Sequence, residues 1–289
     1  MPRDNMASLI QKIARQARTT FKALPPADAG SFQANLAKLS KLLEKIQAED
    51  LNLGPRRNGG PPPPQLGAHQ GPPVTYMHIC ETDSFSMGVF LLQSGSCIPL
   101  HDHPGMHGLL KVLYGQVAIK CFDKEEEEKE EEEEEDEKEE EEEEDENEEA
   151  AAGSGADVQG VQFNPPLLQC QRAALRRSLR RSSDVLSEAS DPCLLTPVQG
   201  NMHQIEARDG PAAFLDILAP PYDPDEGRDC HYFKMLQVSE NAGDDSPESP
   251  QQQQQQQQPS QPIWLLEVPQ PADFWCGGEP YPGPKVSPD

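Results

Sequence analysis

The chain has 289 residues, of which 35% are hydrophobic, and a formal net charge of −26. The segment from Asp123 to Glu149 contains 23 acidic residues and three lysines, a net charge of −20, so the remainder carries only −6. This composition excludes a chain that is folded into a hydrophobic core over its whole length. It also shows that the negative charge is concentrated in one segment and is not spread over the whole protein.

Compartment and assembly are only loosely constrained by the sequence. No apolar run approaches the roughly 18 to 20 residues that span a bilayer. Seven cysteines, an odd number without a Cys-x-x-Cys pair or a secretory signal, argue against a disulfide framework. We expect a cytoplasmic protein, with a nuclear or mitochondrial pool as the alternative. We also expect a monomer that binds neither nucleic acid nor membrane.

Two amphipathic helices are predicted within the N-terminal helical segment, residues 1–53. The apolar face of the first consists of Ile10, Ile13, Ala14, Ala17 and Phe21. This basic, acid-poor stretch is either a docking helix or a mitochondrial targeting segment. The second helix is predicted to begin at Ser31, a suitable N-cap. Its apolar positions are Phe32, Leu36, Leu39, Leu43 and Ile46.

The rest of the chain is predicted to be a Pro/Gly-rich linker, residues 54–73, followed by one domain, residues 74–289. That domain contains short β-type runs at Val74–Cys80, Phe85–Leu92, Leu110–Cys121, Ala212–Leu218, Cys230–Val238 and Ile263–Val268. Three stretches are predicted to be loops or disordered: the acidic insert 123–153, the Arg/Ser-rich stretch 170–190 and the Ser/Gln-rich stretch 239–262. Many short strands without helices between them favour a mainly β fold, with a jelly-roll barrel the best fit.

Three histidines are candidate metal ligands. His101 and His103 are two residues apart, so on an extended strand both imidazoles point to the same side. His203 follows about a hundred residues later, after a turn that begins at Pro197, and a barrel would bring it opposite the first pair. An isolated His-x-His pair is more often a polar strand face than a metal site, so the surrounding residues decide the interpretation.

Those residues resemble the two motifs of the cupin family. The first motif extends from Gly95 through the His-x-His pair to Gly115, and the second is the Pro-x-Gly-x-x-His pattern around His203. Two positions depart from the family pattern. Gly108 stands where many cupins place a ligating Glu, and the second motif has one extra residue between Pro197 and Gly200.

The departure at Gly108 predicts a site of three neutral ligands. Three imidazoles on one side of a divalent iron leave its double charge uncompensated and about three adjacent positions open. These positions suit a thiolate, a neighbouring amine and dioxygen, and metal coordination deprotonates a thiol. A thiol substrate is therefore favoured, because its anionic sulfur replaces the missing carboxylate charge.

Longer stretches resemble the thiol dioxygenases of the cupin family: Met1–Ile10, Leu100–Gly108, Pro211–Pro224 and Gly278–Lys285. The resemblance implies one Fe(II) per chain on the three histidines and O2 as co-substrate. It implies oxygenation of the thiol of cysteamine to hypotaurine, and of N-terminal cysteine residues of proteins to the sulfinic acid. It further implies an oxygen sensor for arginylation-dependent degradation, and a pair, Cys230 and Tyr232, able to form a thioether cross-link.

Three further residues are candidates for supporting roles. Asp216 and Tyr76 lie on predicted core strands and offer acceptors for a substrate amine, although a capping role for Asp216 and a packing role for Tyr76 remain as alternatives. His107 is a candidate to orient a metal-binding histidine by hydrogen bonding, with a solvent-facing loop position as the alternative. Cys230 and Tyr232 are also compatible with ordinary strand packing.

Two other functions are compatible with the sequence. The first is a cupin metal enzyme of another class, such as an isomerase or a carbon-cleaving dioxygenase, which the glycine at position 108 argues against. The second is a non-catalytic protein in which the acidic and Gln-rich segments bind partners on a cupin scaffold.

Overall fold

A computed structural model describes residues 7–24, 26, 28–54, 71–125, 163–172, 174–238 and 263–287. Most of the predicted linker, most of the acidic insert and all of the Ser/Gln-rich stretch 239–262 lie outside these residues. The chain divides into two compact units. The first comprises Met1–Asp123, Arg180–Lys234 and Val268–Asp289, and the second comprises Lys124–Leu179 and Met235–Glu267.

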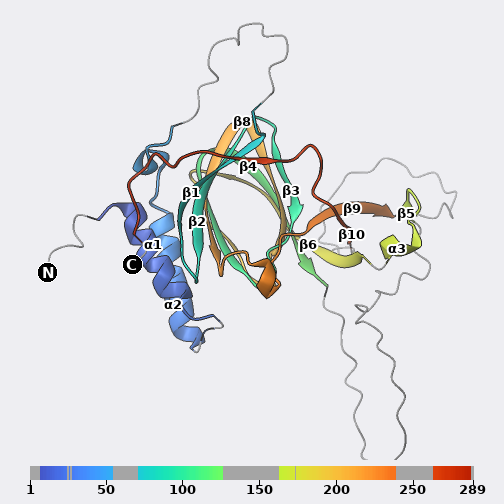
Figure 1. The fold of residues 1–289 in the computed structure, drawn as a ribbon, viewed down its shortest axis with the longest axis horizontal. Coiled ribbons are helices and arrows are strands. Elements are labelled where there is room, and N and C mark those ends of the chain that lie inside the picture. The colour runs from blue at the N-terminus through green and yellow to red at the C-terminus, as the bar shows by residue number, and fades with distance from the viewer. Residues whose placement is uncertain are drawn as a thin grey trace, which may run out of the picture. The chain divides into compact units, whose positions relative to one another are not determined.

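The first unit holds two helices and most of the strands (Figure 1). They are α1 (Leu9–Phe21), α2 (Ala29–Leu43), β1 (Val74–Glu81), β2 (Ser86–Leu92), β3 (Cys97–His101), β4 (His107–Lys124), β7 (Cys193–Leu195), β8 (Met202–Ala219) and β11 (Cys276–Gly278), with short 3-10 helices at Ala48–Leu51 and Pro224–Glu226. The second unit holds β5 (Phe163–Asn164), α3 (Gln169–Arg172), most of β10 (Ile263–Val268) and the last residue of β4, while β6 (Leu175–Ser187) and β9 (Tyr232–Val238) are divided between the two units.

Strands β4 and β8 are the longest and pair with each other in both halves of the barrel. The C-terminal half of β8 pairs with β2, which continues through β1 to β11. The N-terminal half of β8 pairs with β3 instead. Between the halves the register breaks at Gly115 (φ 74°), where a Cβ atom would lie 2.4 Å from the carbonyl oxygen of Pro211. A glycine is required there because the two backbones approach so closely.

Two hydrophobic clusters fill the two faces of this barrel. The inner one contains residues such as Val112, Ile205 and Phe214. The outer one contains the alternate positions, such as Leu113 and Leu215, together with the helices. The alternation along each strand is the period of two expected for a sheet that is buried on both faces. The predicted mainly β barrel is confirmed.

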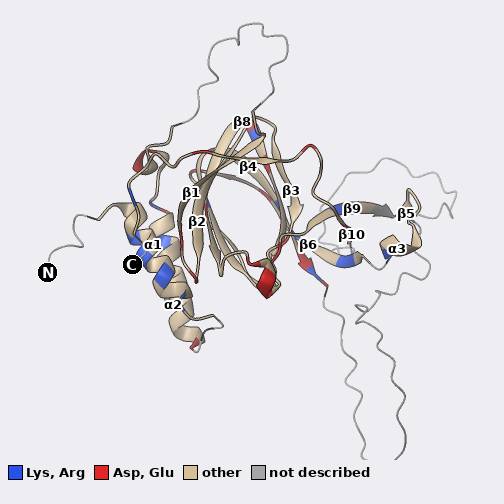
Figure 2. Ribbon diagram, in the orientation of Figure 1, with Lys and Arg blue, Asp and Glu red and all other residues tan. Residues whose placement is uncertain are grey.

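Helix α1 presents the apolar face that its sequence predicts, and every residue of that face is at most 1% exposed. The start of α2 differs from the prediction. Its N-cap is Asp28, not Ser31, because the Asp28 carboxylate accepts hydrogen bonds from the backbone N–H groups of Gly30 and Ser31, both at 3.1 Å. The earlier acidic residue thus satisfies the free amides of the first turn. Figure 2 shows the ribbon of both helices in blue at the Lys and Arg positions.

The prediction that residues 170–190 form a loop is wrong, because Leu175–Ser187 is strand β6. Leu175 and Ser178 are buried, and Arg176, Arg177 and Arg181 form ion pairs with acidic residues. Arg181 forms an ion pair with Asp123 at 3.0 Å. Composition favoured solvation, but strand formation depends on the neighbouring strand and on side-chain partners more than on intrinsic propensity.

In the part of the chain that is described, no helix is long and apolar enough to cross a membrane.

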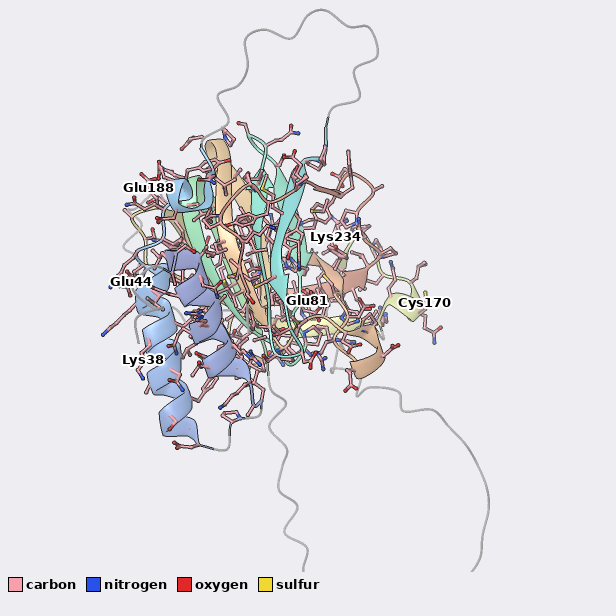
Figure 3. The ribbon with its side chains drawn as sticks, turned by 60° about the vertical axis from the view of Figure 1, so that its left-hand side comes forward. Lys38, Glu44, Glu81, Cys170, Glu188 and Lys234 are labelled. Carbon is pink, nitrogen blue, oxygen red and sulfur yellow. The ribbon has the colours of Figure 1, made fainter. Side chains whose placement is uncertain are left out.

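Docking of α2 onto the outer cluster is testable by a matched pair of substitutions. Leu39 is fully buried, whereas Lys38 is exposed and labelled on α2 in Figure 3. We expect Leu39→Ala to lower the free energy of unfolding by about 2–5 kcal/mol, through lost burial and the cavity left behind. Lys38→Ala should change it by less than about 0.5 kcal/mol. Equal effects of the two variants in chemical denaturation would contradict this packing.

Candidate metal centre

The three candidate histidines come together at one end of the inner cluster. His101 is the last residue of β3 and is paired with His203 of β8 on one side and with Tyr232 of β9 on the other. His103 lies beyond the end of β3, so the extended strand predicted for the His-x-His pair ends at its first member. All three side chains are nonetheless directed to one point, with one nitrogen of each ring within 4.8 Å of the others.

Both the backbone and the ring of His103 are held by residues outside its own loop. The Asn201 side chain accepts a hydrogen bond from the His103 N–H at 3.1 Å and donates one to the His103 carbonyl at 2.6 Å. The Tyr222 hydroxyl lies 2.7 Å from His103 Nδ1 and donates to the Asp102 carbonyl at 2.9 Å. A hydroxyl has a single proton, so His103 Nδ1–H is the donor to Tyr222.

The hydrogen bonds to Nδ1 fix the tautomers of His101 and His103. His101 Nδ1 lies 2.8 Å from the Pro99 carbonyl, an acceptor only, so this nitrogen carries the proton. With Nδ1 protonated in His101 and His103, Nε2 of each is an unprotonated acceptor. Nε2 of His103 and Nε2 of His203 are 3.4 Å apart. A hydrogen-bonded Nδ1 and a free Nε2 are the usual state of a metal-binding histidine.

Burial keeps the three imidazoles neutral. Their exposed fractions are 8%, 3% and 7%, and burial lowers the pKa of each ring below its usual value. In His103 the neighbouring imidazoles of His101 and His203 lower the pKa further. Neutral nitrogens are the form that binds a metal ion, so protons compete weakly at this site.

The histidine cluster opens into a cavity of about 470 Å³, here called the triad cavity. Its lining includes the three histidines, Phe90, Phe214, Asp216, Tyr222, Cys230, Tyr232, Phe274 and Trp275. No Lys or Arg occurs among the described residues that line it. Most of the walls are therefore apolar, and Asp216 is the carboxylate among them.

The position that a fourth, carboxylate ligand would occupy is closed by packing. A Cβ atom on Gly108 would lie 2.8 Å from Leu195 Cγ and 3.1 Å from Leu218 Cδ2. Distances this short require the leucines to move before any side chain fits. The structure thus gives a physical reason for the departure at Gly108, since the space of the side chain is taken by Leu195.

The carboxyl of Asp216 lines the cavity from β8, where burial raises its pKa to about 7. Tyr76 is not among the residues around the triad cavity. It lines an adjoining cavity that also contains Asp216. Asp216 therefore lines both cavities, whereas Tyr76 lines only the adjoining one.

Cys230 and Tyr232 both line the triad cavity and are hydrogen-bonded to each other. Burial raises the pKa of the Cys230 thiol to about 11, and the hydroxyls of Tyr222 and Tyr232 are its hydrogen-bonding neighbours. Cys230 thus has two phenol neighbours, of which the sequence pattern identified only Tyr232.

The predicted role of His107 is wrong. Its ring packs against Phe21 and Phe32 of the two helices, with ring centroids 6.2 and 5.2 Å away. Among the described contacts of His107, none involves His101, His103 or His203. His107 begins β4 on the outer face, so its nearness in sequence to the ligands does not become nearness in space.

Asp102 also has a different partner from the metal-binding histidines. Its carboxylate accepts hydrogen bonds from the backbone N–H of His231, at 2.8 Å, and from the His231 ring at 3.1 Å. This contact fixes the segment that carries Cys230 and Tyr232 beside the metal-binding loop. Asp102 therefore positions the cavity wall, and Tyr222 and Asn201 do the work of orienting His103.

Comparisons with known proteins agree with this site. The PCO_ADO family model matches residues 42–286. A 2-aminoethanethiol dioxygenase of Mus musculus is 50% identical, and one of Homo sapiens is 49% identical, each over 100% of both chains. Plant cysteine oxidase 1 of Arabidopsis thaliana is 28% identical over 73% of this chain and 58% of its own. The chain therefore belongs to the PCO_ADO family of dioxygenases.

Proposed function

We propose that the protein is a non-haem iron(II) dioxygenase that adds both atoms of O2 to the thiol of cysteamine, giving hypotaurine. We propose the same reaction for N-terminal cysteine residues of proteins, giving cysteine sulfinic acid. One iron per chain would be held by Nε2 of His101, His103 and His203. The observation that carries the proposal is the convergence of three neutral imidazoles on the triad cavity. The packing of Leu195 and Leu218 against Gly108, which leaves no room for a carboxylate side chain at that position, supports it.

The donor set fits a divalent iron, because imidazole nitrogens suit it and three of them on one side leave the cavity side open. When bound, the iron supplies adjacent positions for a thiolate and for O2, and it lowers the pKa of the thiol. The names of the relatives support thiol substrates: a 2-aminoethanethiol dioxygenase for the small thiol, and a plant cysteine oxidase for cysteine.

The protein's own residues position the amine end of the substrate. Cysteamine and an N-terminal cysteine both carry an amine two carbons from the sulfur. Asp216, facing the triad cavity, offers a carboxylate acceptor for that amine. With a pKa of about 7, the carboxyl accepts either an ammonium hydrogen bond or a proton near neutral pH. Apolar walls such as Phe90 and Phe214 exclude water around this pair.

We further propose a role in oxygen sensing. Oxidation of an N-terminal cysteine to the sulfinic acid places an anionic group at the start of a protein, the change that an arginylation-dependent degradation route would read. The similarity to a plant cysteine oxidase supports cysteine as a substrate. A rate of sulfinic acid formation that follows the concentration of dissolved O2 is the property that tests this role.

Loss of one histidine should remove both metal and activity. We expect His203→Ala to lose most of its bound iron and to lower the rate of oxygen uptake with cysteamine by at least a hundredfold, because two imidazoles hold the ion too weakly. His78→Ala is the control, since His78 is exposed on β1. Iron content by elemental analysis and product mass decide the case. Full oxygen uptake by iron-free His203→Ala would contradict the proposal.

Removal of the Asp216 charge should affect turnover and stability in opposite directions. The folded-state pKa of about 7 lies above the ordinary value of 3.8, so the carboxyl favours folding at low pH and loses that contribution as pH rises towards 7. In metal-free protein at pH 8, Asp216→Asn should therefore raise Tm by a few degrees. At pH 4 the two Tm values should nearly coincide.

The same Asp216→Asn variant, loaded with iron, should raise KM for cysteamine roughly tenfold through the lost ammonium contact. In the wild type, KM should fall as pH rises through about 7, because the carboxylate form binds the ammonium. An unchanged KM in the variant would rule out Asp216 as the amine acceptor. If the difference in Tm between Asp216→Asn and the wild type is the same at pH 4 as at pH 8, the buried charge of Asp216 does not explain it.

We propose that Cys230 and Tyr232 form a thioether during turnover. The cross-link joins the Cys230 sulfur to a ring carbon of Tyr232, breaks one S–H and one C–H bond, and transfers two electrons and two protons to dioxygen. We expect the mass of the wild type to fall by two hydrogens during turnover and that of Tyr232→Phe to stay constant. Peptide mapping of Tyr222→Phe is the control, and loss of the cross-link there but not in Tyr232→Phe would assign the bond to Tyr222.

A further inference from the structure

A second cavity, also of about 470 Å³, adjoins the triad cavity within the same unit. Five residues line both: Phe90, Asp216, Leu218, Tyr222 and Cys276. The lining that belongs to the second cavity alone consists of Tyr76, Glu81, Ser86, Gly88, Gly277 and Gly278. The Asp216 carboxyl is thus at the boundary, and the second cavity leads from it towards the β1–β2 hairpin.

Strand register fixes how far this cavity extends from Asp216. Asp216 pairs with Gly88, whereas Glu81 pairs with Ser86 and Ser86 with Leu218. Glu81 is therefore displaced from Asp216 by two residues along the strand direction and by two strands across the sheet. With about 3.3 Å per residue and 4.8 Å per strand, their Cα atoms are about 12 Å apart. Glu81 is labelled on β1 in Figure 3.

The Tyr76 ring lies beside Gly88, the residue of β2 that pairs with Asp216. A Cβ atom on Gly88 would lie 2.2 Å from the Tyr76 ring, so the glycine gives the ring its place across β2. Burial raises the pKa of Tyr76, and the charges of Asp216 and Glu81 raise it further. Both carboxylates are thus close enough to act on the same phenol.

The second cavity has no cation of its own. Its described lining contains two carboxylates, two phenols, one aliphatic hydroxyl and one thiol, and no Lys or Arg. The positive charge that would balance these carboxylates must therefore come from a ligand. A cavity lined by negative charges raises the local concentration of cations. The amine of the substrate meets one carboxylate at Asp216. Glu81, about 12 Å further on, remains for a second positive group.

We propose that the second cavity binds the side chain of the residue that follows an N-terminal cysteine, and that Glu81 selects a lysine or arginine at this position. The inference rests on the proposed function, because it takes the cysteine thiol to be in the triad cavity and its amine at Asp216. From that amine, an extended lysine side chain on the next residue reaches about 10 Å, comparable with the Cα separation of Asp216 and Glu81, about 12 Å. Cysteamine, which has no second residue, leaves this cavity unused.

The test compares two peptides that begin with cysteine and differ only in the second residue, lysine or glutamine. For the iron-loaded wild type we expect kcat/KM to be three- to fivefold higher for the lysine peptide, mostly through KM, since an exposed ion pair contributes modestly. In Glu81→Gln the ratio should fall to about one. Because each variant supplies its own ratio, a general loss of activity cancels. Raising the salt concentration to about 1 M should also reduce the wild-type ratio.

Asp83→Asn is the matched control, because Asp83 is an exposed acid in the same hairpin and does not line the cavity. It should keep the wild-type ratio. A ratio near one in the wild type, or an unchanged ratio in Glu81→Gln, overturns the role of Glu81 and leaves the proposed reaction standing. If neither peptide is oxidised while cysteamine is, both this inference and the peptide reaction fail. If cysteamine is also inert, the proposed function itself fails.

Discussion

The change of register where β4 and β8 turn from one half of the barrel to the other is the constraint on which the site depends. His203 and Asp216 are both on β8 but differ by an odd number of residues, so a straight strand would place them on opposite faces. At Asp209 (φ 55°) and Gly210 (φ 144°) the strand departs from regular geometry. After that break, even-numbered positions face inward where odd-numbered ones did before, so ligand and carboxyl share one cavity.

The histidine cluster was predictable because short sequence motifs identify its members. Two histidines in a motif and a third at the start of a strand were sufficient, given a barrel to bring them together. The helix face of α1 was predictable for the same reason, since its period follows from the chain itself. The N-cap of α2 and the length of β8 were less predictable, because a hydrogen bond and a strand partner decide where an element begins.

The supporting residues could not be predicted from spacing, because each acts across the fold. Asn201 and Tyr222 come from turns on either side of β8, and only the closed barrel brings both to His103. In the sequence, Asn201 is marked only by its place beside Gly200, and Tyr222 only by the two prolines before it. Neither pattern is distinctive alone. His107 shows the converse. It is only four residues from His103 in the chain, but the loop between them ends before β4, and His107 packs against Phe21 and Phe32 of the helices.

One consequence of the pairing between His101 and His203 concerns the order of folding events. The ligands His103 and His203 are 100 residues apart in the chain, and their approach requires β3 to pair with the far half of β8. Contacts of such separation close late, because the loop entropy must be overcome first. The unfolded chain therefore offers no assembled triad. Metal uptake at full affinity marks a barrel that has already closed, and the newly made protein becomes an oxygen-consuming catalyst only after its topology is complete.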